Sequence, residues 1–189
     1  MLAWLFAVVL IFCAREFPQW PGVVLCFIGA SLRYWASGYL RKDARPAVGG
    51  PYAFVRNPLY LGTYLMALGT ALAIENFWLL ACATVLFAVI YHFIILDEET
   101  KLHRIFGAPY SRYCELSARF FPRLLPLFWP FAWALHQRAL LEVNPEKSHH
   151  QFSRELAKKN RANEAYLSFI GLMGFVALIA QGWKYLGSL

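Results

Sequence analysis

Charge is scarce in this sequence. Only 15% of the 189 residues are charged, whereas a soluble domain of this size carries about a quarter. Acidic residues are scarcer than basic ones, 11 against 18, and 59% of the chain is hydrophobic. The apolar excess argues against a nucleic-acid-binding protein despite the net charge of +7. Basic residues in such a chain are typical of the cytoplasmic loops of a membrane protein.

Several chemical signatures are also missing. The four cysteines are scattered without a CxxC pair (Cys13, Cys26, Cys82 and Cys114), so we interpret them as small hydrophobic residues. The pair His149–His150 has no cysteine or second histidine pair at ligand spacing, so a metal site is not expected. No dinucleotide fingerprint supports a nicotinamide-dependent lipid reductase. No basic segment precedes the first apolar stretch, which argues against a signal peptide.

Apolar segments dominate what is there. Their lengths predict an all-helical, polytopic membrane protein with five transmembrane helices in one domain, residues 1–189. The expected spans are residues 1–14, 20–40, 58–74, 77–96 and 165–186. Residues 124–135 are apolar but short and contain two prolines, so we expect them to lie in the interface.

Lysine and arginine set the expected orientation. They gather in residues 41–57, 97–123 and 136–164, and the positive-inside rule places all three segments in the cytoplasm. The amino terminus is then cytoplasmic as well, and the turn Glu75–Asn76 faces the other side. The chemically rich segments therefore share one face, and residues 136–164 form a cytoplasmic connector with helical character.

The first polar cluster is "GGPYAFVRNPLYLG", residues 49–62. Gly49-Gly50-Pro51 predicts a turn. Asn57 is a favourable N-cap residue and Pro58 a favourable first residue for the third span. Gly62 and Gly69 lie seven residues apart, on one helix face where small residues let helices approach closely.

The second cluster is "LDEETKLHRIFGAPYSRYCELSARFFPRL", residues 96–124. Acidic residues oppose the dipole at a helix C-terminus. If the helix continues to Phe106, Glu98 and Glu99 are instead mid-helix and can pair with Lys101, His103 or Arg104. Gly107 then ends the helix, and Tyr110 and Tyr113 lie on one face of the next.

Together the two clusters resemble a family of membrane methyltransferases, which includes isoprenylcysteine carboxyl methyltransferases and phospholipid methyltransferases. The shared pattern is Gly-Pro-Tyr, Arg-x-Pro-x-Tyr-x-Gly, Glu-Glu and Phe-Gly-x-x-Tyr-x-x-Tyr, and it covers about residues 46–123. The remainder, residues 124–189, is the connector and the last span.

The resemblance implies an enzyme that uses S-adenosylmethionine in a pocket at the cytoplasmic face. It assigns catalytic roles to Arg56, Asn57, Glu98 and Glu99, and contact with the substrate to Arg56 and Arg119. It assigns contact with the cofactor to Gly50, Pro51, Tyr52, Asn57, Tyr60, Gly62, Glu98, Glu99, Tyr110 and Tyr113. The residue types fit, because the cofactor offers a carboxylate, an ammonium, a sulfonium and an adenine.

Asn57 departs from the pattern, since the family usually has His there. Asn cannot titrate, and methylating a carboxylate needs no base, whereas methylating an ammonium needs a proton removed first. The sequence therefore favours carboxyl O-methylation of a lipidic or prenylated acceptor. Phospholipid N-methylation stays open, as does a non-catalytic membrane scaffold or transporter subunit. A transporter typically carries polar or broken segments near midmembrane, whereas here the polar residues gather at one face.

Overall fold

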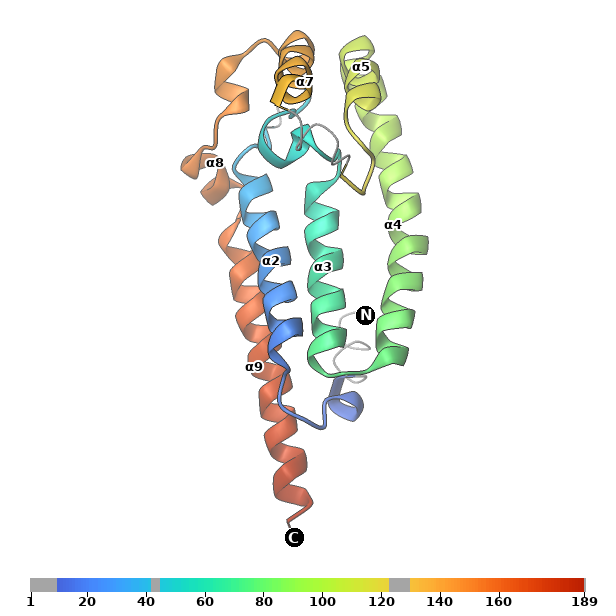
Figure 1. The fold of residues 1–189 in the computed structure, drawn as a ribbon, viewed down its shortest axis with the longest axis vertical. Coiled ribbons are helices and arrows are strands. Elements are labelled where there is room, and N and C mark those ends of the chain that lie inside the picture. Colours follow the sequence, from blue (N-terminus) through green and yellow to red (C-terminus); the bar gives the residue numbers. More distant parts are fainter. Residues whose placement is uncertain (1–9, 42–44, 123–129, 189) are drawn as a thin grey trace.

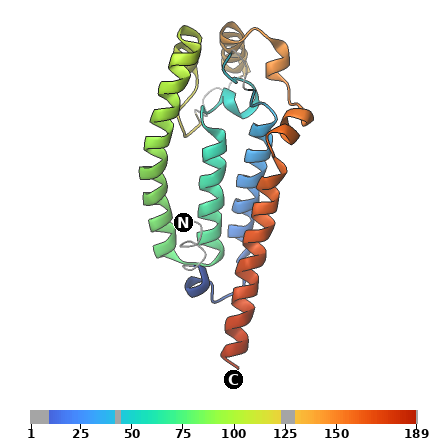
Figure 2. The ribbon, with the colours of Figure 1, turned by 180° about the vertical axis from the view of Figure 1, so that it is seen from behind.

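A computed structural model describes residues 10–41, 45–122 and 130–188. Within these residues the chain is helical and contains no strand, apart from an isolated bridge between Val55 and Ala118. The long helices are α2 (Trp20–Ser37), α3 (Pro58–Ala73), α4 (Phe77–Phe106) and α9 (Asn163–Leu186). They run side by side, and α9 extends beyond the others at the carboxyl end (Figures 1 and 2).

The shorter helices gather at one end of this bundle (Figure 1). They are η1 (Gly50–Ala53), α5 (Ala108–Leu116), α7 (Pro130–Val143), η2 (Lys147–His150) and α8 (Arg154–Lys159). The loop before α3 and the segment after α4 therefore meet at the same end, as the charge pattern predicts. The connector is helical for much of its length, which agrees with its expected character.

Local signals explain where the long helices begin and end. Pro58 is the first residue of α3. The side chain of Asn76 accepts a hydrogen bond from the Leu79 amide at 2.8 Å and so caps the start of α4. Gly107 ends α4 at a φ of 59°, in the left-handed region that favours glycine. The acidic pair therefore lies inside α4, as the longer-helix interpretation predicts.

Small residues bring α2 and α3 into close contact. A Cβ atom added to Gly22 would lie 2.1 Å from the Ala73 amide nitrogen, and one added to Gly69 would lie 2.5 Å from the Cys26 nitrogen. Only glycine permits this approach, so the predicted role of Gly69 as a close-packing residue is confirmed. Gly62 makes the same kind of contact with the Gly29 carbonyl.

Two helices of the described residues are long and apolar enough to cross a membrane, α4 and α9. Large apolar side chains project from both, including Phe93, Leu167 and Leu178, each more than 60% exposed. The expectation of five spans is therefore met only in part. The shorter α3 has 16 residues, Arg33 interrupts the apolar character of α2, and most of the expected first span lies outside the described residues.

Candidate functional site

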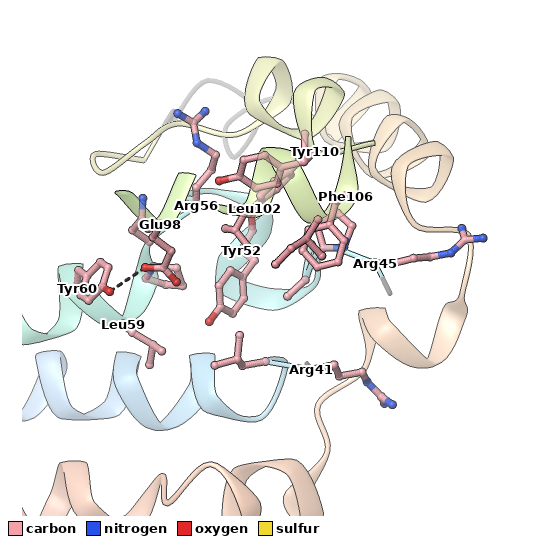
Figure 3. A pocket seen from close by; sticks show the side chains of 17 residues that line it. Arg41, Arg45, Tyr52, Arg56, Leu59, Tyr60, Glu98, Leu102, Phe106 and Tyr110 are labelled. Carbon is pink, nitrogen blue, oxygen red and sulfur yellow. Dashed lines mark hydrogen bonds between the residues drawn. The ribbon is translucent and has the colours of Figure 1, made fainter. Parts of the chain in front are cut away.

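A cavity of about 410 Å³ lies at the end of the bundle where the short helices gather. This size is within the usual range for small-molecule sites, about 300–1,000 Å³. Both sequence clusters contribute to its wall (Figure 3). The described residues that line it are Leu40, Arg41, Arg45, Pro46, Ala47, Tyr52, Arg56, Asn57, Pro58, Leu59, Tyr60, Glu98, Leu102, Ile105, Phe106, Tyr110 and Tyr113.

The turn before α3 places Tyr52 and Arg56. Gly50 adopts a φ of 55°, and a Cβ atom there would lie 2.5 Å from the ring of Tyr39, so the turn requires glycine. The Tyr52 amide then donates to the Gly49 carbonyl at 3.1 Å. Further on, the Arg56 amide donates to the Ala118 carbonyl at 2.8 Å, which ties this loop to the segment after α5.

Arg56 is fixed by the protein itself. Its Nε and Nη2 both donate to Glu99 Oε1, at 3.1 and 2.9 Å. Its Nη1 donates to the carbonyls of Cys114 and Ser117 at 2.7 and 2.8 Å. These bonds use four of the five guanidinium N–H groups, and the side chain is only 10% exposed. Arg56 therefore joins α4, α5 and the loop before α3, and it does not extend toward the membrane–water interface.

Glu99 is paired on both oxygens. Arg119 Nη2 lies 2.9 Å from Oε2, while Arg56 binds Oε1. Glu99 is buried at 8% exposure, and neither it nor Arg119 lines the cavity. The pairing within α4 that the sequence allowed is not the one that Glu99 makes, because the two arginines reach it from other segments. The i,i+4 pair on this helix is Asp97–Lys101 instead.

Glu98 faces the cavity. Adjacent residues of a helix point about 100° apart, so Glu98 cannot follow Glu99 toward the arginines. Its Oε2 accepts a hydrogen bond from the Tyr60 hydroxyl at 2.8 Å (Figure 3). Among the described lining residues it is the one carboxylate, and no basic side chain pairs with it there. The acidic pair is therefore divided between one structural carboxylate and one that a ligand can reach.

Tyrosines form much of the remaining wall. Tyr110 and Tyr113 are each 2% exposed, and the Tyr113 hydroxyl donates to the Tyr52 carbonyl at 2.7 Å. Burial raises the pKa of all three tyrosines, and for Tyr52 the charge of Glu98 raises it further. The hydroxyl groups therefore stay protonated and can donate hydrogen bonds over the whole physiological range.

Asn57 occupies the N-cap position of α3, but its side chain makes no capping bond. The Nδ2 group instead donates to the Arg119 carbonyl at 2.9 Å. The side chain is therefore engaged with the segment that follows α5 and not with the first turn of α3. The predicted side-chain cap is therefore wrong, whereas the position is correct, and Asn57 does line the cavity.

Three of the proposed cofactor residues lie away from the cavity in addition to Glu99. Gly50 and Pro51 form the turn that positions Tyr52. Gly62 packs on α2, where a Cβ atom would lie 2.6 Å from Arg33 Cγ. The structure thus gives these residues a role in packing, and direct contact with a ligand at Gly50, Pro51 and Gly62 stays a prediction without geometric support.

Sequence patterns do not reveal one side of the cavity, which residues 40, 41 and 45–47 form. Arg41 and Arg45 line it, and their guanidinium groups extend outward in Figure 3. Asn144 stabilises this side of the cavity. Its side chain is fully buried and donates to the Pro46 carbonyl at 3.1 Å. Asn160 Nδ2 donates to the carbonyls of Ser37 and Leu40, both at 2.8 Å. No local pattern could have revealed these contacts, because each spans about a hundred residues.

The segment that matches a known protein family contains most of the residues that line the cavity. Residues 34–109 match the model of the phospholipid methyltransferase family. The resemblance drawn from the two clusters is thereby confirmed for that segment, which includes the lining residues from Leu40 to Phe106. Tyr110 and Tyr113 follow directly after it.

Curated relatives extend this match. The chain is 31% identical to the cobalt-zinc-cadmium resistance protein CzcN of Cupriavidus metallidurans, over 61% of this chain and 52% of the relative. It is 31% identical to the nickel-cobalt-cadmium resistance protein NccN of Alcaligenes xylosoxydans, over 54% and 47%. It is 35% identical to the protein-S-isoprenylcysteine O-methyltransferase of Schizosaccharomyces pombe, over 45% and 36%. The matches thus span about half the length of these relatives or less, and no solved structure matches the chain.

Proposed function

We propose that this chain is a membrane methyltransferase that binds S-adenosylmethionine in the cavity and methylates a lipidic acceptor. The observation that carries the proposal is the division of the acidic pair. Glu98 offers an unneutralised carboxylate beside aromatic walls, which suits a ligand that carries an ammonium and a sulfonium. The match of residues 34–109 to phospholipid methyltransferases supports the same chemistry.

The residues present fit this cofactor. Glu98 would bind its amino group, and the aromatic rings of Tyr52, Phe106 and Tyr110 would contact the adenine and the sulfonium. Arg56 has one N–H left after its protein contacts, and this group would meet the carboxylate, whereas the guanidinium groups of Arg41 and Arg45 extend outward and would act only through their charge. The bound cofactor would supply an activated methyl group, and the protein's part is to orient the acceptor and to exclude water.

The acceptor follows from the membrane setting and from Asn57. We propose carboxyl O-methylation of a prenylated acceptor, in keeping with the activity for which the Schizosaccharomyces pombe relative is named. Asn57 cannot remove a proton, and a carboxylate does not need that step. The alternative is N-methylation of a phospholipid amine, which the match to the phospholipid methyltransferase family favours. In that case Glu98 is the carboxylate of the described wall that could accept the proton.

Titration calorimetry tests the cofactor assignment directly. We expect the purified full chain in detergent to bind S-adenosylmethionine and its demethylated product, S-adenosylhomocysteine, at one site. Adenosine serves as a control, because it lacks the amino and carboxylate groups and should bind more weakly. Absence of heat with both cofactor forms, from protein that is folded by circular dichroism, would refute the proposal.

We further propose that five helices span the membrane, with the cavity at the cytoplasmic face, in a single domain of residues 1–189. A cysteine at Phe77, which is 72% exposed at the start of α4, should react with an impermeant maleimide from outside intact cells. A cysteine at the exposed Glu155 of α8 should react only after the cells are opened. Both variants, Phe77→Cys and Glu155→Cys, are made after the native cysteines are replaced, and the reverse labelling pattern contradicts the topology.

A further inference from the structure

Arg33 is a charged residue within an otherwise apolar helix. It lies four residues before the end of α2, about 6 Å along the axis from that end at 1.5 Å per residue. In a spanning helix this depth is the border between lipid headgroups and acyl chains. Ionisable residues at such positions are costly, and they often mark binding sites or transport pathways.

The surroundings of Arg33 leave its charge uncompensated. Its Nη1 donates to Thr63 Oγ1 and, at 3.4 Å, to the Leu59 carbonyl. Both acceptors are neutral, and none of the ion pairs found among the described residues includes Arg33. Gly62 makes room for its aliphatic stem. The guanidinium is therefore held against α3 by the protein, but it is not neutralised by the described residues.

The free edge of this guanidinium has the geometry of an anion site. Nε and the two N–H groups of Nη2 have no hydrogen-bond partner in the described part of the chain. Neither nitrogen is fully enclosed, since Arg41 Nε is the one enclosed side-chain atom without a partner among the described residues. This Nε–Nη2 edge binds carboxylate or phosphate in a bidentate manner. In Arg56 the same edge is occupied by Glu99.

The position of Arg33 relates this edge to the cavity. Leu59 lines the cavity wall, and Thr63 lies one turn further along α3 on the same face. Because Arg33 binds to both, its guanidinium lies beside the wall, on the side toward the middle of the helices. A lipidic molecule whose chain lies among the helices would present its anionic head at this depth.

We propose that Arg33 binds the anionic head of the lipidic acceptor, so that the enzyme selects acceptors with a carboxylate or phosphate group. This inference rests on the proposed function, because it assigns the substrate class of the same site. The alternative source of the same chemistry is the headgroup of an ordinary anionic lipid of the bilayer.

The test uses the full chain in nanodiscs of phosphatidylcholine. The probes are a fluorescent S-farnesylcysteine derivative with a free carboxylate and its neutral carboxamide. We expect Arg33→Met to weaken binding of the carboxylate probe about tenfold or more, since a bidentate charged bond is lost, and to leave the carboxamide unchanged. Arg33→Lys keeps the positive charge but cannot form the bidentate pair, so it should weaken binding of the carboxylate probe less than Arg33→Met does. Arg138→Met removes an exposed arginine of α7 and should leave both probes unchanged.

Three outcomes overturn the proposal. Equal weakening of both probes would show that Arg33 acts only in packing, and unchanged binding of both would show no contact. In nanodiscs that also contain phosphatidylglycerol, displacement of the probe from the wild type but not from Arg33→Met would assign the site to a bilayer lipid. Calorimetry with S-adenosylmethionine separates this inference from the proposed function. If the wild type does not bind the cofactor, the proposed function is refuted. The difference between the carboxylate and carboxamide probes in Arg33→Met tests this inference alone.

Discussion

Glu98→Gln is expected to weaken S-adenosylmethionine binding by about 10- to 150-fold, which corresponds to roughly 1.5–3 kcal/mol for a charge-assisted hydrogen bond. The physical reason is that Glu98 is the one carboxylate that the described cavity wall offers to a cationic ligand. Its known partner in the protein is a neutral hydroxyl, Tyr60. The stability of the fold should therefore change little.

Tyr60→Phe is the matched control for this prediction. It removes the hydroxyl that binds Glu98 but keeps the carboxylate and the aromatic ring, so most of the cofactor affinity should remain. Calorimetric dissociation constants and thermal unfolding of the three proteins give both readouts. An affinity loss in Tyr60→Phe as large as that in Glu98→Gln would show that the pair acts as a structural unit, and cofactor contact at Glu98 would then be wrong.

Glu99→Ala is expected to destabilise the protein strongly, by about 3–5 kcal/mol, because removing one partner of a buried ion pair leaves the other charge uncompensated. Arg56 would keep its two carbonyl acceptors but lose both bonds to Oε1. Glu99→Gln separates charge from geometry, since its amide oxygen can still accept from Arg56. We expect an intermediate loss of unfolding free energy for that variant.

Asp97→Asn provides the comparison on the same helix. The pair Asp97–Lys101 is about two thirds exposed on both sides, and such surface pairs contribute about 0–1 kcal/mol. Chemical denaturation in detergent, followed by circular dichroism, measures all three variants. A loss for Glu99→Ala no larger than that for Asp97→Asn would contradict the structural role of the Arg56–Glu99–Arg119 cluster.

Much of the fold follows from local signals. The apolar lengths predict the long helices, Asn76 and Gly107 mark the bounds of α4, and Gly69 marks the contact between α2 and α3. The number of membrane-crossing helices follows less directly, because the apolar lengths of α2 and α3 lie at the margin of what spans a bilayer. A helix can enter a bundle at that length whether or not it crosses the bilayer.

The site was predictable as a set of residues but not as a set of roles. Sequence shows Glu98 and Glu99 as an equivalent pair, and only the packing of α4 against two other segments divides them. The sequence assigns Arg56 a catalytic role and contact with the substrate, whereas four of its five N–H groups bind Glu99 and two carbonyls of the protein. Arg33 gave a visible signal, a lone charge in an apolar span. Asn144 gave none, because an asparagine after a helix has no distinctive pattern.

The contact between Asn144 and Pro46 also bears on how the protein is made. The two residues are 98 positions apart in the chain, so at roughly 5–20 residues per second the ribosome needs about 5–20 s to pass from one to the other. During that interval the loop after α2 has been synthesised, but its hydrogen-bond donors Asn144 and Asn160 have not. The cavity wall is complete only when the connector has left the ribosome, so a nascent chain that already contains both motif clusters does not yet hold a finished site.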